Sequence, residues 1–286
     1  MPSASQPREG SDGIERKLRF RKTPRAILAR IVRTILVFIA TVYALAVALS
    51  VVVAATGGRE SPILAIGYAT MLLPAFAAFL LRATTNEGTQ IDWSRLPISY
   101  MPVALLLMPA VMHTAMLPTM DAIAGRLPWT REIAWPHVIL NATVGLLVVS
   151  ALALFEEIGW RGWLLPRLAE RSGTRNGIIT TAIIWALWHI PFIWSGILSV
   201  EGLSAARTIM VVPFGTFGAG LVIGWLWART RSIWIAALAH GALNNWGQFA
   251  FKYMQAGPEL DLTSVLLAGS VALVLTGTML VARLRP

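Results

Sequence analysis

The chain has 286 residues, of which 56% are hydrophobic and 13% charged, and its mean hydropathy is +0.65. This composition excludes a protein that faces water on all sides and is typical of a membrane protein. The absence of cysteine excludes disulfides, thiolate nucleophiles and cysteine-ligated zinc or iron–sulfur sites. The net charge of +10 could suggest a nucleic-acid partner, but the basic residues lie mostly in loops and one tail.

Eight apolar segments are long enough to cross a hydrocarbon core of roughly 30 Å at about 1.5 Å per residue. They predict an all-α polytopic membrane protein, a bundle of about eight transmembrane helices with an intramembrane cavity that faces the cytoplasm. The predicted spans are Thr34–Ala55, Ile63–Leu81, Tyr100–Leu117, Val138–Phe155, Ile178–Trp194, Thr208–Ala228, Ile233–Phe251 and Thr263–Ala282. Prolines weaken the third and fifth of them.

The distribution of Lys and Arg predicts the orientation. Eight crossings place both termini on one side, and 19 of the 24 Lys and Arg residues fall in the tail and loops of that side. The positive-inside rule therefore favours a multi-pass protein of the cell membrane with both termini in the cytoplasm. This asymmetry accounts for the basic charge, so we expect the lipid bilayer as a partner and no nucleic acid.

Two regions are expected along the chain. Residues 1–33 are polar and basic, and we interpret them as a disordered cytoplasmic tail that sets the topology. The apolar stretch that follows is too long for a typical cleavable signal peptide, so we expect an uncleaved first span. Residues 34–286 then form a single transmembrane domain.

Ionisable residues are concentrated at the end of the fourth span. Apolar residues resume after Glu156 and Glu157, so the helix is expected to continue toward Arg167 and to hold both acids inside the membrane. An ionisable group there costs about 3 kcal/mol or more unless it has a partner or faces a cavity. Glu157 and Arg161 are four residues apart and can pair on one helical face. Glu156 lies about 100° around the helix and is left freer to react.

Further polar side chains lie in the fifth and seventh spans. The fifth carries His189, and the seventh carries His240 and Asn244, whose spacing of four residues places them on one helical face. Two such side chains could hold one oxygen atom from two directions. Trp185 is interpreted, together with Trp188, as packing around the histidine, and Asn245 as a spare polar residue. Two glycines, Gly220 and Gly224, indicate close helix packing in the sixth span.

These groups are predicted to lie at one depth. Counted from the nearest cytoplasmic arginine, Glu156 is 11 residues into its helix and His189 is 14. His240 and Asn244 are 9 and 13 residues from Arg231. The four depths are roughly 14 to 21 Å at about 1.5 Å per residue. Three helices would then bring reactive groups to one level, although chance alignment competes with this interpretation because helices near 20 residues offer few levels.

The ordered motifs resemble a known family. Glu156-Glu157-x-x-x-Arg161, an aromatic residue four positions before His189, and His240-x-x-x-Asn244 are similar to the three motifs of the CPBP (Abi) family of intramembrane glutamic endopeptidases, which includes the type II CAAX prenyl proteases. The resemblance covers about residues 138–251. It implies an eight-helix fold in which Glu156 activates water, His189 assists, and His240 with Asn244 forms the oxyanion site. Trp185 departs from the family, which usually has phenylalanine there.

The residues themselves are compatible with this chemistry. Hydrolysis of an amide needs an activated water, a proton donor for the leaving amine and stabilisation of the oxyanion, and no cofactor is required if the donors are preorganised. We therefore predict an endopeptidase acting on a membrane-associated or prenyl-like peptide, or on a membrane protein, with Glu157 and Arg161 in support.

Two other functions stay open from the sequence. A zinc-dependent membrane protease could use Glu156, His189 and His240 as ligands, although the paired histidines of zincins, with their intervening Glu, are missing. Metal analysis and chelators would distinguish it. A non-enzymatic transporter or immunity protein could use the same buried polar groups, but no repeated half supports transport and the complete set of motif residues argues against a degenerate scaffold.

Overall fold

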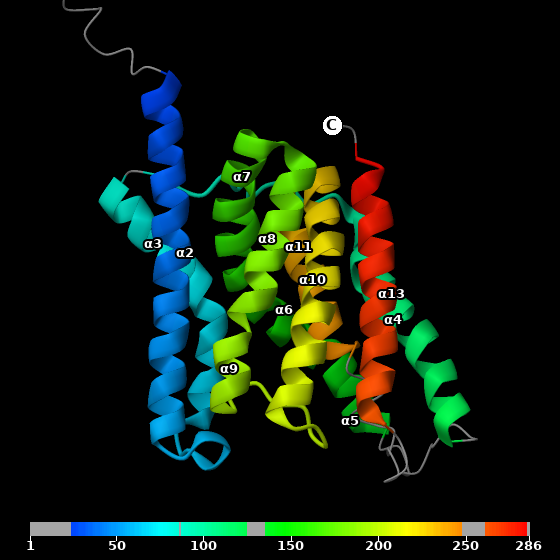
Figure 1. Cartoon of the computed structure of the whole chain (residues 1–286). Coiled ribbons are helices and arrows are strands. Elements are labelled where there is room, and N and C mark those ends of the chain that lie inside the picture. The colour runs from blue at the N-terminus through cyan, green and yellow to red at the C-terminus, as the bar shows by residue number, and fades with distance from the viewer. Residues whose placement is uncertain (1–23, 86, 125–134, 248–260, 285–286) are drawn as a thin grey trace, which may run out of the picture.

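The computed structural model describes residues 24–85, 87–124, 135–247 and 261–284, and within these ranges the chain forms helices and connecting loops without a β-strand. Most of the helices run side by side as a bundle (Figure 1). In chain order the elements are α2 (Pro24–Ala55), η1 (Gly58–Glu60), η2 (Leu64–Leu72), α3 (Leu73–Thr85), η3 (Ile98–Tyr100), α4 (Met101–Ala124), α5 (Trp135–Leu140), η4 (Asn141–Gly145), α6 (Leu146–Gly159), η5 (Trp160–Leu164), α7 (Leu165–Ser172), α8 (Thr174–Trp188), α9 (Ile190–Ser195), α10 (Ala205–Thr230), α11 (Ile233–Asn245) and α13 (Leu262–Ala282).

Six helical segments of the described chain are long and apolar enough to cross a membrane, which confirms the predicted all-α polytopic membrane protein. They are Ala29–Ala55, Ile98–Met120, Trp135–Ser172, Thr174–Ser195, Ala205–Thr230 and Leu262–Ala282. The second and seventh predicted spans correspond to shorter helices, the apolar helix Ala69–Thr85 and the 13-residue α11. The last four residues of the seventh predicted span, 248–251, lie outside the described residues.

The first helix begins before its apolar part. Helix α2 starts at Pro24, ten residues ahead of the predicted span, because proline with its fixed φ and missing N–H suits the first position of a helix. The predicted boundary at Thr34 marks the start of the apolar sequence. Residues 1–23 of the predicted tail lie outside the described residues. The start of α2 and the end of α13 lie at the same end of the bundle (Figure 1).

The helix that carries the acidic pair is longer than a bilayer. Its 38 residues, Trp135–Ser172, correspond to about 57 Å at about 1.5 Å per residue. The prediction that this helix continues past Glu156 is confirmed. Arg161 and Arg167 were counted with a cytoplasmic loop, but both side chains are buried in this helix. The number of Lys and Arg residues in the tail and loops on the side of the termini therefore falls from 19 to 17, so the asymmetry of basic charge between the two sides remains large.

Two π-helical turns interrupt this long helix, and each is bound by another part of the chain. A π-turn changes the backbone hydrogen-bond pattern of a helix and is frequent at functional sites. In η5 the carbonyl of Gly162 accepts a hydrogen bond of 2.7 Å from the Gln90 N–H. A Cβ at Gly162 would lie 2.6 Å from Ile91. The absence of a side chain therefore allows the loop after α3 to lie directly on η5.

The other π-turn, η4, is bound by helix α11. The Asn245 side chain donates to the carbonyl of Asn141 at 2.7 Å, and the Trp246 indole donates to that of Ala142 at 3.1 Å. The interpretation of Asn245 as a spare polar residue was wrong. The sequence does not show that the Asn141 carbonyl in η4, 104 residues earlier in the chain, lies within hydrogen-bond distance of this side chain. Asn245 joins two helices.

We predict that Asn245→Ala lowers the free energy of unfolding by about 1–2 kcal/mol, because it removes the hydrogen bond that joins α11 to η4. Thermal unfolding in detergent measures this change. The matched control is Asn244→Ala on the next residue, whose side chain makes no hydrogen bond within the described residues. The control should alter stability by less than about 0.5 kcal/mol. Equal losses in both variants would contradict the structural role of Asn245.

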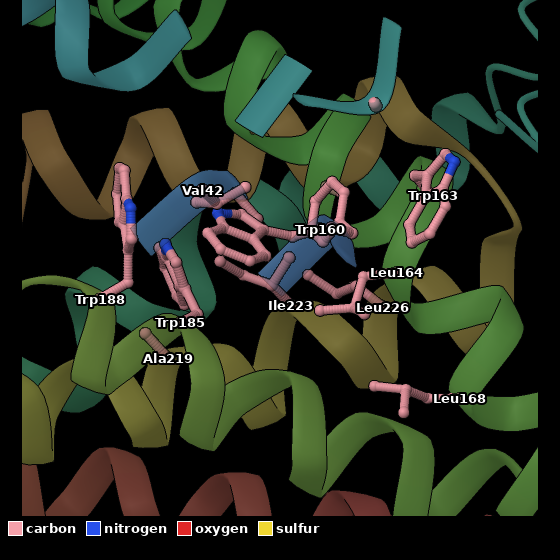
Figure 2. Close-up of a cluster of buried hydrophobic side chains, with 14 of the residues drawn as sticks. Val42, Trp160, Trp163, Leu164, Leu168, Trp185, Trp188, Ala219, Ile223 and Leu226 are labelled. Carbon is pink, nitrogen blue, oxygen red and sulfur yellow. The ribbon is translucent and has the colours of Figure 1, made fainter. Parts of the chain in front are cut away.

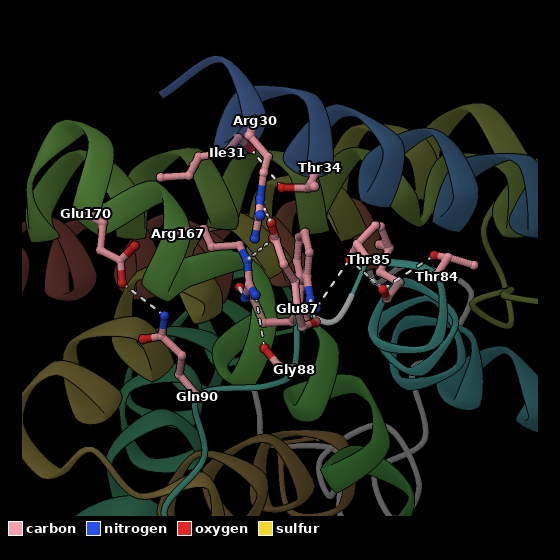
Figure 3. Close-up of polar contacts among 12 residues, drawn as sticks. Arg30, Ile31, Thr34, Thr84, Thr85, Glu87, Gly88, Gln90, Arg167 and Glu170 are labelled. Carbon is pink, nitrogen blue, oxygen red and sulfur yellow. Dashed lines mark hydrogen bonds and ion pairs between the residues drawn. The ribbon is translucent and has the colours of Figure 1, made fainter. Parts of the chain in front are cut away.

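A cluster of charges holds the loop after α3 to two helices (Figure 3). Glu87 forms ion pairs with Arg30 of α2 at 2.9 Å and with Arg167 of α7 at 3.4 Å. Arg167 also donates to the carbonyl of Gly88 at 3.0 Å and lies over the Trp163 ring at 4.0 Å from its centroid. These contacts fix the loop over the end of the helix that carries the acidic pair.

Tryptophans fill the core beside the acidic pair. The side chains of Trp160, Trp163, Trp185 and Trp188 are at most 2% exposed and form one hydrophobic cluster (Figure 2). Opposite them, helix α10 presents its glycines to α8. A Cβ at Gly220 would meet Ala182 at 2.8 Å, and a Cβ at Gly224 would meet Ile178 at 2.6 Å. The predicted close packing at these two glycines is confirmed.

Candidate active site

The six predicted site residues come from three parts of the bundle. Two acids, Glu156 and Glu157, lie in the last turn of α6, and Arg161 follows in η5. His189 lies at the junction between α8 and α9, while α11 carries the other two predicted residues. Four of the six residues are buried, namely Glu156, Glu157, Arg161 and His240, and the other two, His189 and Asn244, are half-buried.

A proline explains the position of His189. Helix α8 ends at Trp188 and α9 begins at Ile190, with Pro191 in its first turn. Proline has no N–H to donate to the preceding turn, so the helix breaks there. The expected weakening of the fifth span at Pro191 is therefore present, and it leaves His189 at the junction of two helices.

Glu157 joins helix α6 to helix α11. Its Oε1 accepts a hydrogen bond from Arg161 Nη1 at 2.8 Å and another from His240 Nδ1 at 2.9 Å. The predicted pair with Arg161 is present, and the bond to His240 is a contact that the sequence did not predict. Glu157 and Arg161 are both fully buried, so each charge depends on the other for compensation.

The bond between Glu157 and His240 requires α11 to approach α6 closely. Gly241 makes this approach possible, because a Cβ at this position would lie 2.7 Å from the Ser150 Cα and would overlap the Ser150 hydroxyl. Two helices can come this near only where one of them lacks a side chain. Gly241 is a further residue of the site region that sequence reasoning missed, although its place beside His240 was a signal.

We predict that Gly241→Ala destabilises the protein by about 1–3 kcal/mol, because the added methyl group must push α11 away from α6. Alanine by itself favours a helix over glycine by about 1 kcal/mol, so a loss of stability here is informative. Thermal unfolding measures it, with Gly88→Ala as the control, since a Cβ at Gly88 has no neighbour closer than 3.8 Å. A stabilised Gly241→Ala variant would contradict the close approach.

Glu156 is held by two tryptophans. Its Oε2 accepts a hydrogen bond from the Trp185 indole at 2.8 Å and another from the Trp160 indole at 3.3 Å. Its Oε1 makes no hydrogen bond within the described residues. The sequence predicted that Glu156 is freer to react than Glu157. The structure corrects this prediction for Oε2, because a tryptophan side chain can donate a hydrogen bond to a carboxylate as well as fill space. Oε1 is therefore the oxygen of this carboxyl group that has no hydrogen-bond partner in the described chain.

The interpretation of Trp185 as packing was therefore incomplete. A tryptophan has both an apolar ring and an N–H donor, which usually finds a partner when it is buried. The signal in the sequence was the departure from phenylalanine at this position, which adds a donor four residues before His189.

The hydrogen bond of His189 determines which ring nitrogen carries its proton. Nδ1 lies 2.8 Å from the Trp185 carbonyl oxygen, which can only accept, so Nδ1 is the donor. In the neutral ring Nε2 then has a free electron pair and can take a proton from water. This arrangement suits the predicted role of His189 as an assistant to Glu156.

His240 uses its Nδ1 to donate to Glu157, so its Nε2 can donate to an oxyanion only when the ring carries both protons. Asn244 lies one turn further along α11, and its amide makes no hydrogen bond within the described residues. The two side chains keep the predicted spacing on one helix. Their joint action on a single oxygen atom stays a prediction.

The contacts agree with the predicted common depth. Glu156 in α6 binds Trp185 in α8, and Glu157 in α6 binds His240 in α11. The Trp185 ring lies 5.6 Å from the His189 ring and 4.9 Å from the His240 ring, centroid to centroid. Three helices therefore meet at one level of the bundle. The imidazoles of His189 and His240 both contact the Trp185 ring, and the N–H of that ring binds Glu156.

In the part of the chain that the structure describes, no group of three or more His, Asp or Glu side chains is arranged to hold a metal ion. The Nδ1 atoms of both site histidines are already bound to protein acceptors. The chelator experiment below tests whether zinc takes part.

These features define a polytopic helical membrane protein with a buried cluster of glutamate, arginine and histidine. Residues 137–246 match the family model described as "Type II CAAX prenyl endopeptidase Rce1-like". The CAAX prenyl protease 2 of Methanococcus maripaludis is 28% identical over 153 residues, which are 50% of this chain and 54% of that protein. The chain therefore spans about half the length of the curated relative that it matches. The resemblance to the type II CAAX prenyl proteases is confirmed.

Proposed function

We propose that the protein is an intramembrane endopeptidase that hydrolyses a peptide bond of a membrane-associated substrate with a water activated by Glu156 and His189. The observation that carries this proposal is the buried Glu156 carboxylate, which shares the Trp185 ring with two imidazoles from separate parts of the bundle. The match of residues 137–246 to a family of prenyl endopeptidases adds support for this class of reaction.

In the proposed mechanism a water molecule binds to Glu156 Oε1 and His189 Nε2. Glu156 takes one proton of this water as the oxygen attacks the carbonyl carbon of the substrate, which gives a tetrahedral oxyanion. Asn244 Nδ2 and a doubly protonated His240 donate hydrogen bonds to that oxyanion. The carbon–nitrogen bond then breaks, and the proton held by Glu156 passes to the leaving amine.

Glu157 and Arg161 have a supporting role in this proposal. Arg161 compensates the charge of Glu157, and Glu157 fixes the His240 ring through Nδ1. The orientation of His240 toward the substrate therefore depends on two groups that do not react.

The substrate class is proposed from the name of the relative, which is called a CAAX prenyl protease. We propose a peptide with a lipid-modified cysteine near its C-terminus, which the bilayer would hold at the depth of the site. We also propose that both termini lie on the cytoplasmic side of a cell membrane, because most Lys and Arg residues lie on the side of the termini.

The test uses the full chain in lipid nanodiscs with a synthetic farnesylated peptide ending in a CAAX sequence, and the same peptide without the lipid. Mass spectrometry should detect release of the three C-terminal residues from the farnesylated peptide. Cleavage of neither peptide would overturn the proposal for this substrate. Loss of activity with 1,10-phenanthroline, and its return with added zinc, would favour the zinc-dependent protease instead.

A further inference from the structure

The Trp185 side chain contacts four of the six predicted site residues. Its indole N–H donates to Glu156 at 2.8 Å, and its ring lies edge-on to His189 and His240. The Arg161 guanidinium carbon lies 4.8 Å from the centroid of the same ring. Trp185 is 2% exposed, so its N–H is shielded from water and depends on the carboxylate as its acceptor.

A Glu156 that acts as a base must be ionised, and the Trp185 N–H then binds a charged acceptor. A donor that binds an ionised acceptor forms a shorter and roughly twofold stronger bond than a neutral pair. Glutamate has several rotatable bonds, and in a buried site the bond that fixes its rotamer also fixes the reacting oxygen. Trp160 donates to the same oxygen from the neighbouring turn at the longer distance of 3.3 Å. Both donors bind Oε2 and leave Oε1 without a partner in the described chain.

We propose that Trp185 is a positioning residue whose N–H holds Glu156 in the orientation that presents Oε1 to water, an inference that rests on the proposed peptidase function. Its ring at the same time contacts both imidazoles. Because the carboxylate is already fixed before the substrate binds, no reorganisation is needed when charge moves in the transition state. The N–H should therefore affect the rate of the chemical step and not the binding of the peptide.

The same helix contains a matched control for this proposal. Trp188 is 1% exposed and lies 5.3 Å from the His189 ring, centroid to centroid. Its Nε1 is buried and makes no hydrogen bond within the described residues. Trp185 and Trp188 lie close together in the same hydrophobic cluster (Figure 2). Trp188→Phe removes an indole of equal size without removing a hydrogen bond, whereas Trp185→Phe removes the donor to Glu156.

The experiment compares Trp185→Phe, Trp188→Phe and Trp160→Phe/Trp185→Phe with the wild type, each as the full chain in nanodiscs. We expect kcat to fall about tenfold in Trp185→Phe and about a hundredfold in the double variant, with KM unchanged. Trp188→Phe should keep kcat within about twofold of the wild type. Equal kcat values in Trp185→Phe and Trp188→Phe, or a change in KM alone, would overturn the proposal.

A measurement without substrate separates this inference from the proposed function. Ultraviolet resonance Raman difference spectra report whether the indole N–H that each substitution removes was hydrogen-bonded. Trp185→Phe should remove a strongly bonded N–H and Trp188→Phe an unbonded one, whereas an unbonded N–H at Trp185 would overturn the inference. An inactive wild type that still shows the bonded N–H would overturn the proposed function and the catalytic part of this inference, and leave the contact itself established.

Discussion

Glu156→Gln is expected to reduce peptide hydrolysis by at least about a thousandfold without loss of folded protein. The amide can still accept hydrogen bonds from Trp185 and Trp160, so the packing is preserved, but it cannot take a proton from water. Product formation by purified protein, followed by mass spectrometry, measures the rate. Thermal unfolding of the same sample establishes that the fold is intact.

The control for this variant is Glu170→Gln in the same long helix. Glu170 is exposed and accepts a hydrogen bond from the Gln90 side chain, away from the acidic pair. Its activity should remain within about twofold of the wild type. Full activity in Glu156→Gln would remove this carboxylate from the mechanism and with it the proposed reaction.

Arg161→Met should lower the free energy of unfolding by about 3–5 kcal/mol, because it removes the arginine that compensates the buried Glu157 carboxylate and leaves that carboxylate only its hydrogen bond to His240. The side chains of Arg161 and Glu157 are 1% and 0% exposed, so water cannot replace the lost partner. Unfolding by denaturant in mixed micelles measures the change. Arg171→Met removes an exposed arginine from α7 and should change stability by less than about 0.5 kcal/mol.

A double variant separates the effect on stability from the effect on activity. Removing both charges with Arg161→Met/Glu157→Gln should recover at least about half of the lost stability, because a missing pair is less harmful than one unpaired charge. Activity should stay low in the double variant, since the carboxylate that fixes His240 is gone. A double variant less stable than Arg161→Met alone would contradict the pairing of these two charges.

The difference between the roles of Glu156 and Glu157 shows where sequence reasoning reached its limit. A spacing of four residues was enough to predict the pair of Glu157 with Arg161, because helical geometry is local. The bonds from Glu156 to Trp185 and from Glu157 to His240 join residues 29 and 83 positions apart. Which acid faces which partner depends on how three helices rotate against one another, and periodicity does not fix that rotation.

The amino-acid sequence by itself determined that the chain is helical and spans a membrane, because hydrophobic length and the distribution of charge act on each segment separately. It also predicted a common depth for the acids and histidines, since depth follows from counting residues along a helix. The tertiary structure alone decided that Trp185 binds Glu156, that Gly241 lets α11 approach α6, and that Asn245 binds η4. These contacts arise between segments far apart in the chain, and their free energy depends on packing that no single segment encodes.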